Sequence, residues 1–143
     1  MRRMIFIMAS VLACTSAFAA GSAEAQLKIL REVSSVASVA WSTYQNEGMS
    51  GLQMLSQECW QDVDRQGFKC LRIDMAARHI DRRAGGGTAF PLNPYFGNQE
   101  LAKRVWPFFD RNNADRNEAS DYLVSLQTMM GQAVDHAITK QQK

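Results

Sequence analysis

Two histidines and a short run of carboxylates are the residues of this sequence that could bind a metal ion. The run from Asp62 to Gly67, DVDRQG, begins like a calcium-binding loop, but Ile73 stands at the twelfth position, where a bidentate glutamate is needed. His79 and His136 lie far apart, and neither has a neighbour at zinc-ligand spacing. We therefore expect no metal and no other cofactor.

Sequence patterns typical of catalytic sites do not occur in the chain. It contains no GxSxG motif, no P-loop and no dinucleotide-binding fingerprint. The glycines at 85–87 follow a helical pattern and precede none, so they make a poor phosphate cradle. Asp74, Arg78 and Asp81 recur at helical steps, which we interpret as a solvated face of salt bridges. An enzyme is not expected.

An irregular segment, TAFPLNPYFG at 88–97, is the best candidate for a binding surface. Its two prolines and flanking glycines exclude a regular helix or strand. Loops on a rigid scaffold commonly carry recognition, and aromatic side chains make good interface anchors. We predict four contact residues for a partner, with Asn93 and Tyr95 exposed: Leu92, Asn93, Tyr95 and Phe96. In the alternative interpretation, Phe90, Leu92 and Phe96 fold back over the helices and close the core.

The N-terminus has the three parts of a secretory signal peptide: two arginines, an apolar run over 4–13, and small residues up to 25. We predict a signal peptide over 1–25, with cleavage after 19 or 25, and a single domain over 26–143. The apolar run is too short for a membrane anchor. A lipoprotein box ending at Cys14 and a twin-arginine signal are weaker alternatives. Export to the periplasm is the expected location.

The charge balance excludes some classes of partner. Removal of residues 1–25 takes away Arg2, Arg3 and Glu24, which leaves 14 basic and 13 acidic residues and a net charge of +1. Proteins that bind nucleic acid or membrane surfaces usually carry a basic excess. We therefore expect neither as a partner.

Cys59 and Cys70 are the two cysteines that remain after cleavage, and in an exported chain an even number predicts a disulfide. The alternative, a reactive thiol activated by His79, needs a lowered thiol pKa. In one unbroken helix the two residues would lie roughly 16 Å apart, whereas a disulfide needs Cα atoms within about 7 Å. The chain must therefore turn between them, around Asp62 to Gly67, and form an antiparallel helix pair.

Apolar residues at three- and four-residue steps predict an all-α fold, a compact bundle of about five helices with one disulfide. A first helix from Leu27 should stop at 46–48, and a second should begin at a capping box at Ser50. A third begins near Phe68 and ends at 85–87. A fourth begins at Asn98 and ends or kinks at Pro107, and the last covers about 117–138.

Part of this pattern resembles the Tai and Rap immunity proteins of type VI secretion. The resemblance covers roughly residues 48–132, and rests on Leu52-x-x-Leu55-x-x-x-Cys59, on Cys70 eleven residues later, and on the helical spacing of 94–130. The sequence departs from that family at Arg72-Ile73-Asp74, and it lacks the second cysteine pair of some members.

The resemblance implies a periplasmic immunity-type protein that binds a type VI secreted peptidoglycan amidase of the Cys/His type and occludes its active site. Because the family commonly forms dimers, it also implies a homodimer. No family motif maps onto the segment at 88–97, so its role is our own hypothesis. Two alternative functions remain: a periplasmic chaperone or stress protein, for which five methionines in the mature chain would suit changing contacts, and an accessory subunit of an envelope complex.

Overall fold

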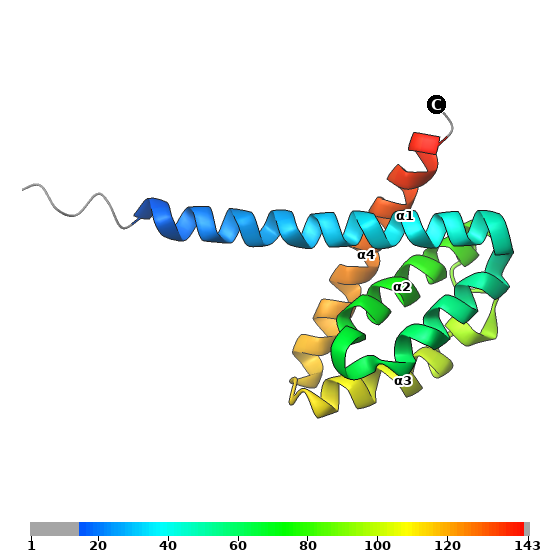
Figure 1. Ribbon diagram of the computed structural model, residues 1–143. Coiled ribbons are helices and arrows are strands. Elements are labelled where there is room, and N and C mark those ends of the chain that lie inside the picture. The colour runs from blue at the N-terminus through cyan, green and yellow to red at the C-terminus, as the bar shows by residue number, and fades with distance from the viewer. Residues whose placement is uncertain (1–14, 142–143) are drawn as a thin grey trace, which may run out of the picture. The chain divides into compact units, whose positions relative to one another are not determined.

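The computed structural model describes residues 15–141, with side chains from residue 23 onward. These residues form four α-helices and one 3-10 turn, without any strand (Figure 1). The elements are α1 (Thr15–Gln61), α2 (Val63–Ala84), η1 (Pro94–Phe96), α3 (Asn98–Arg111) and α4 (Arg116–Gln141). The all-α prediction is confirmed.

The described helices number four, not the predicted five, because the first two predicted helices are joined in α1. The predicted stop coincides with Gly48, where the backbone is not helical, with φ 68° and ψ −158°. Glycine reaches this positive φ without the clash that a Cβ atom would cause. The chain therefore changes direction at one residue and needs no loop.

Contacts divide the chain into two units, one up to Arg31 and one from Glu32 onward. The described part of the first unit is the N-terminal part of α1, where Leu27, Ile29 and Leu30 are exposed. The arginine pair, the apolar run and Cys14 lie outside the described residues, and both predicted cleavage points fall within α1. The signal peptide stays a prediction. Between residues 15 and 141, no helix combines the length and apolar character needed to cross a membrane.

Helix α2 is the centre of the unit that begins at Glu32. It packs against α3 and α4, and the disulfide joins it to α1. Its side chains from Cys70 to Asp81 are buried on almost every side, with only Arg72 and His79 partly exposed. Leu71, Met75 and Ile80 form the middle of the core, with Val33 and Leu52 of α1 and Val134 of α4. Any polar residue in this stretch of α2 must find its partners inside the protein.

The predicted disulfide between Cys59 and Cys70 is confirmed, with the two Cα atoms 5.5 Å apart. The reversal between the cysteines is tighter than predicted, since only Asp62 separates α1 from α2. Helix α2 thus begins at Val63 rather than near Phe68. The predicted turn residues from Val63 to Gly67 belong to its first turns.

Pro107 lies inside α3, so of the two predicted outcomes, an end or a kink of the helix, the end does not occur. A proline removes one helical hydrogen bond, the one to the carbonyl four residues back. Pro107 is exposed, as is Lys103, whose carbonyl loses its helical donor. Water can therefore bond that carbonyl while Val105 and Phe108, on the opposite side of the helix, pack into the core.

The close approach of α2 and α3 depends on a glycine. A Cβ atom placed on Gly67 would lie 2.1 Å from the Cε2 atom of Phe108. The Phe108 ring also meets the rings of Phe68 and Trp60 edge to face, with centroids 5.1 and 6.1 Å away. It therefore has no free space into which it could move.

We expect Gly67→Ala to lower the free energy of unfolding by about 2 kcal/mol, because overpacking a filled core forces side chains off their rotamers. Urea unfolding followed by circular dichroism measures the change. Phe108→Leu should recover part of the loss when combined with Gly67→Ala, since the smaller side chain makes room. Additive losses in the double variant would show that the contact is not the cause.

Replacing both cysteines by alanine should lower the free energy of unfolding by about 3 kcal/mol, since the sequence separation of 11 residues closes a short loop in the unfolded chain. The helix content by circular dichroism should stay the same. Equal urea midpoints with and without the disulfide would contradict this expectation.

Candidate functional site

The predicted binding segment lies in the loop that joins α2 to α3, residues 85–97, which we call the binding loop. Its first glycines end α2: the amides of Gly85 and Gly87 donate to the carbonyls of Asp81 and Arg82, at 3.0 and 2.8 Å. Gly86 and Gly87 have φ of 83° and 82°, values that side chains other than glycine rarely adopt. The loop therefore leaves the helix along a path that these glycines permit.

Asn93 is bonded to the scaffold and within the loop. Its backbone N–H donates to Oδ2 of Asp81 at 2.7 Å, and its side-chain Oδ1 accepts from the N–H of Tyr95 at 2.9 Å. Asp81 is 4% exposed, so this carboxylate is held inside the protein. The middle of the binding loop is thereby fixed to the last turn of α2.

Arg78 holds the end of the loop. Its guanidinium donates through Nη1 to the carbonyl of Phe96 and through Nη2 to Oδ1 of Asn98, the latter at 2.8 Å. The Phe96 side chain is fully buried, and Arg78 itself is 7% exposed. A buried cation and a buried aromatic ring therefore fasten the junction between the binding loop and α3.

The carboxylate of Asp74 is fully buried and joins three helices. It accepts a hydrogen bond from Ser56 Oγ and one from Trp60 Nε1 at 3.0 Å, both on α1. From α3, Arg104 Nη2 lies 3.1 Å from its Oδ2. Burial raises the pKa of the Asp74 carboxyl, while the Arg104 charge and these hydrogen bonds act in the opposite direction.

Tyr95 connects the binding loop to this buried cluster. Its hydroxyl lies 3.0 Å from Ser56 Oγ, and its carbonyl accepts from Arg104 Nη2 at 3.1 Å. The guanidinium of Arg104 also stacks over the Tyr95 ring, 3.9 Å from its centroid. Burial raises the pKa of the Tyr95 hydroxyl, so the residue stays a neutral hydrogen-bonding group at neutral pH.

The polar face of α2 is therefore not solvated, and our interpretation of Asp74, Arg78 and Asp81 as a surface salt-bridge face is wrong. All three side chains are buried, because α1, α3 and the binding loop cover that side of α2. Their partners Ser56 and Arg104 were not predicted. Nothing in one sequence pairs an aspartate with residues 18 and 30 positions away.

The predicted contact residues differ in exposure. We expected Asn93 and Tyr95 to be exposed, but both are half-buried and bonded internally. Phe96 is buried in the core, as the alternative interpretation predicted for it. Leu92 is 61% exposed and Phe90 is 68% exposed, so neither is tucked into the core. The apolar surface available to a partner is thus at Phe90 and Leu92, before the anchored end of the loop.

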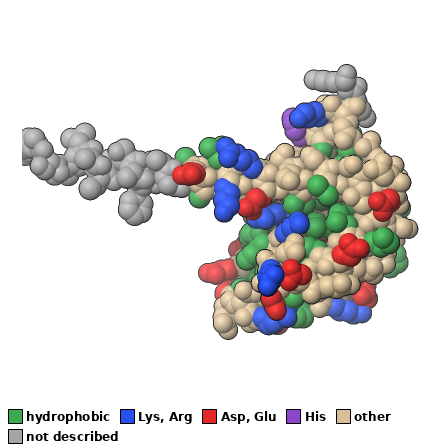
Figure 2. Space-filling model, in the orientation of Figure 1, with side chains coloured by type: hydrophobic (Ala, Val, Ile, Leu, Met, Phe, Trp, Pro, Cys, Tyr) green, Lys and Arg blue, Asp and Glu red, His purple; other side chains and the backbone are tan. Residues whose placement is uncertain are grey.

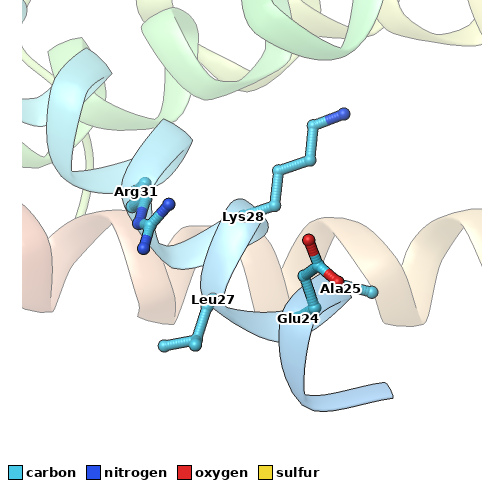
Figure 3. Close-up of a pocket in the computed structure, with 5 residues that line it drawn as sticks. All are labelled: Glu24, Ala25, Leu27, Lys28 and Arg31. Atoms are coloured by element: carbon cyan, nitrogen blue, oxygen red, sulfur yellow. The ribbon is translucent and has the colours of Figure 1, made fainter. Parts of the chain in front are cut away.

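Two hollows lie among the described residues. One is lined by Glu24, Ala25, Leu27, Lys28 and Arg31, all from a single stretch of α1 (Figure 3). Another, of about 280 Å³, is lined by Trp41, Tyr44, Ile80, Arg83, Ala84 and Ile138, without a carboxylate, thiol or imidazole. This lining suits packing better than chemistry.

His79 is engaged in a polar contact rather than in a metal site. Its Nε2 lies 2.8 Å from Oδ1 of Asp135, which Arg83 also binds. Partial burial opposes ionisation of Asp135, but the hydrogen bonds from His79 and Arg83 hold the pKa of that carboxyl below its ordinary value. Over residues 15–141, no three His, Cys, Asp or Glu side chains are placed to hold a metal ion.

We expect Tyr95→Phe to lower the free energy of unfolding by about 1 kcal/mol, because it removes one partly buried hydrogen bond to Ser56 and keeps the ring under Arg104. Amide hydrogen exchange at 93–97 should become faster. Tyr44→Phe is the matched control, since no hydrogen bond of the Tyr44 hydroxyl occurs in the described structure. Equal effects of the two substitutions would argue against an anchoring role for Tyr95.

Comparisons of this chain with protein-family models, with curated proteins and with solved structures found no match.

Proposed function

We propose that this protein is an exported binding protein that inserts the tip of its binding loop into a groove of a partner protein. One observation carries the proposal: the loop exposes Phe90 and Leu92, while its next residues are fixed to the scaffold by buried polar groups. An exposed apolar tip on a fixed base is the arrangement expected of an inhibitor loop that keeps one conformation before and after binding.

The hydrogen bonds that fix the loop reduce the entropic cost of association. A flexible loop loses conformational freedom when a partner immobilises it, whereas a loop already fixed loses little. In the binding loop, hydrogen bonds at Asn93, Tyr95 and Phe96 hold three of the last five residues. The aromatic ring of Phe90 can then contribute its full burial to binding.

The partner in this proposal is a peptidoglycan amidase of the Cys/His type, secreted by a type VI system. What supports it is the resemblance to immunity proteins, together with the predicted signal peptide and the disulfide. Occlusion of an active-site groove needs no chemistry from the inhibitor, and a fixed loop with exposed apolar side chains suits that role.

The contact residues are revised accordingly. Because Asn93 and Tyr95 bond internally, their replacement would disturb the loop itself as well as any contact. Phe96 supports the loop from below. We therefore assign the partner contact to Phe90 and Leu92, of which Leu92 also rests against Gly85.

We expect Phe90→Ala to weaken the complex with the amidase about 30-fold, the loss typical of an aromatic hot spot. The test uses a small Cys/His amidase encoded in an adjoining reading frame, with affinity measured by calorimetry and inhibition by peptidoglycan hydrolysis. The urea midpoint should not change, because the side chain is 68% exposed.

Val124→Ala is the matched control, since Val124 is 69% exposed on α4, outside the binding loop. It should leave affinity unchanged. If Phe90→Ala binds and inhibits like the unaltered protein, the loop tip is not the contact. If no adjoining amidase binds the unaltered protein, the assignment of the partner is wrong.

A further inference from the structure

Arg78 is a buried cation without a carboxylate partner in the described structure. Both of its bonded acceptors, the carbonyl of Phe96 and the side-chain oxygen of Asn98, are neutral, and its Nε–H has no acceptor at all. The nearby Asp74 is engaged by Arg104. A buried charge is costly without a counter-charge, so this arginine calls for an explanation.

Arg82 adds a second positive charge on the same side of α2. Its charge acts on Arg78, whose pKa is lowered first by burial and then by this repulsion. Arg82 is partly exposed and forms no ion pair in the described structure. The next residue, Arg83, is by contrast neutralised by Asp135.

The packing of α3 places its N-terminus at this arginine pair. Helices α2 and α3 run antiparallel, as three contacts between them show. In the order of α2, Gly67 meets Phe108, Asp74 meets Arg104, and Arg78 meets Asn98. Arg82 lies one turn further along α2, and thus just beyond the first residue of α3. Helical side chains lean toward the N-terminus of their own helix, and Asn98, which Arg78 bonds, lies on that side of Arg82.

The first turn of α3 offers backbone donors at the same place. Its N-cap is Gly97, which has no side chain to accept from them, and the first amide with a helical acceptor is that of Leu101, bonded to the Gly97 carbonyl at 3.0 Å. Asn98 and Gln99 are exposed. Free N–H groups and the helix dipole favour an anion here. The carboxylate of Glu100 in the same turn is bound by Lys103.

We propose that the N-terminus of α3, together with Arg82 and the buried guanidinium of Arg78 behind it, binds a carboxylate of the partner protein. This inference rests on the proposed function, and it gives the partner's chemistry. The binding loop itself is uncharged from Ala84 to Gln99. A partner would thus present an apolar groove to Phe90 and an acidic side chain beside it to Arg82.

The site can be tested without the partner, with acetate as the probe. In ¹⁵N NMR titrations of the purified protein with sodium acetate, against sodium chloride at equal ionic strength, the Asn98 and Gln99 amides should shift saturably. Arg82→Gln should reduce these shifts at least about threefold, because it removes the exposed cation next to the helix terminus. Lys69→Gln, which removes an exposed cation near the start of α2, at the opposite end of that helix from Arg82, is the control and should keep them. Shifts that do not saturate, or that persist in Arg82→Gln, would overturn the site.

A second measurement tests whether the partner supplies the carboxylate. Arg82→Gln should weaken the amidase complex about tenfold, and Lys69→Gln should not. Unchanged affinity in Arg82→Gln, with acetate still bound by the unaltered protein, would refute the partner's role in this site. If instead the proposed function is wrong, the pattern differs: Phe90→Ala also leaves the affinity for the amidase unchanged, while the unaltered protein still binds acetate.

Discussion

The buried carboxylate of Asp74 is the interaction on which the rest of the unit from Glu32 onward depends. It lies on α2 and accepts from Ser56 and Trp60 of α1 and from Arg104 of α3, so one side chain fixes three helices. Arg104 and Ser56 then bind Tyr95, which extends the connection into the binding loop. Removing one member of such a cluster leaves the others buried and unpaired, which usually costs more than the bond itself contributes.

This polar cluster complements the apolar core rather than replacing it. Leu71, Met75 and Ile80 of α2 pack against α1 and α4, and the hydrophobic effect does not discriminate among similar arrangements of such side chains. The hydrogen bonds that Asp81 accepts and Arg78 donates are directional, and they select one path for the loop. The face in Figure 2 shows acidic and basic side chains interspersed with hydrophobic ones.

The division between a fixed base and an exposed tip gives the loop its proposed role. Phe96, Tyr95 and Asn93 keep the loop in place, and Phe90 and Leu92 are free to make contacts. In the proposed role the polar groups that look suitable for recognition serve the conformation, and the apolar groups serve recognition. The functional question thus concerns a protein surface, and the proposed anion site would add a requirement on the partner's charge.

The sequence by itself determined the features that depend on local spacing. The recurrence of apolar residues every three or four positions determined the all-α fold. The separation of Cys59 and Cys70 required the chain to reverse direction between two helices. Only the tertiary structure decided the rest. Asp74, Arg78 and Asp81 share a polar face that would be solvated on a peripheral helix, but α2 is surrounded on all sides, so the same residues are buried and bonded. Likewise, α3 tolerates Pro107 because that residue faces solvent. The two helices predicted before and after Gly48 are joined directly, because the chain changes direction at this single residue. Burial on the second face of a helix depends on which segments pack there, and those segments are distant in the sequence.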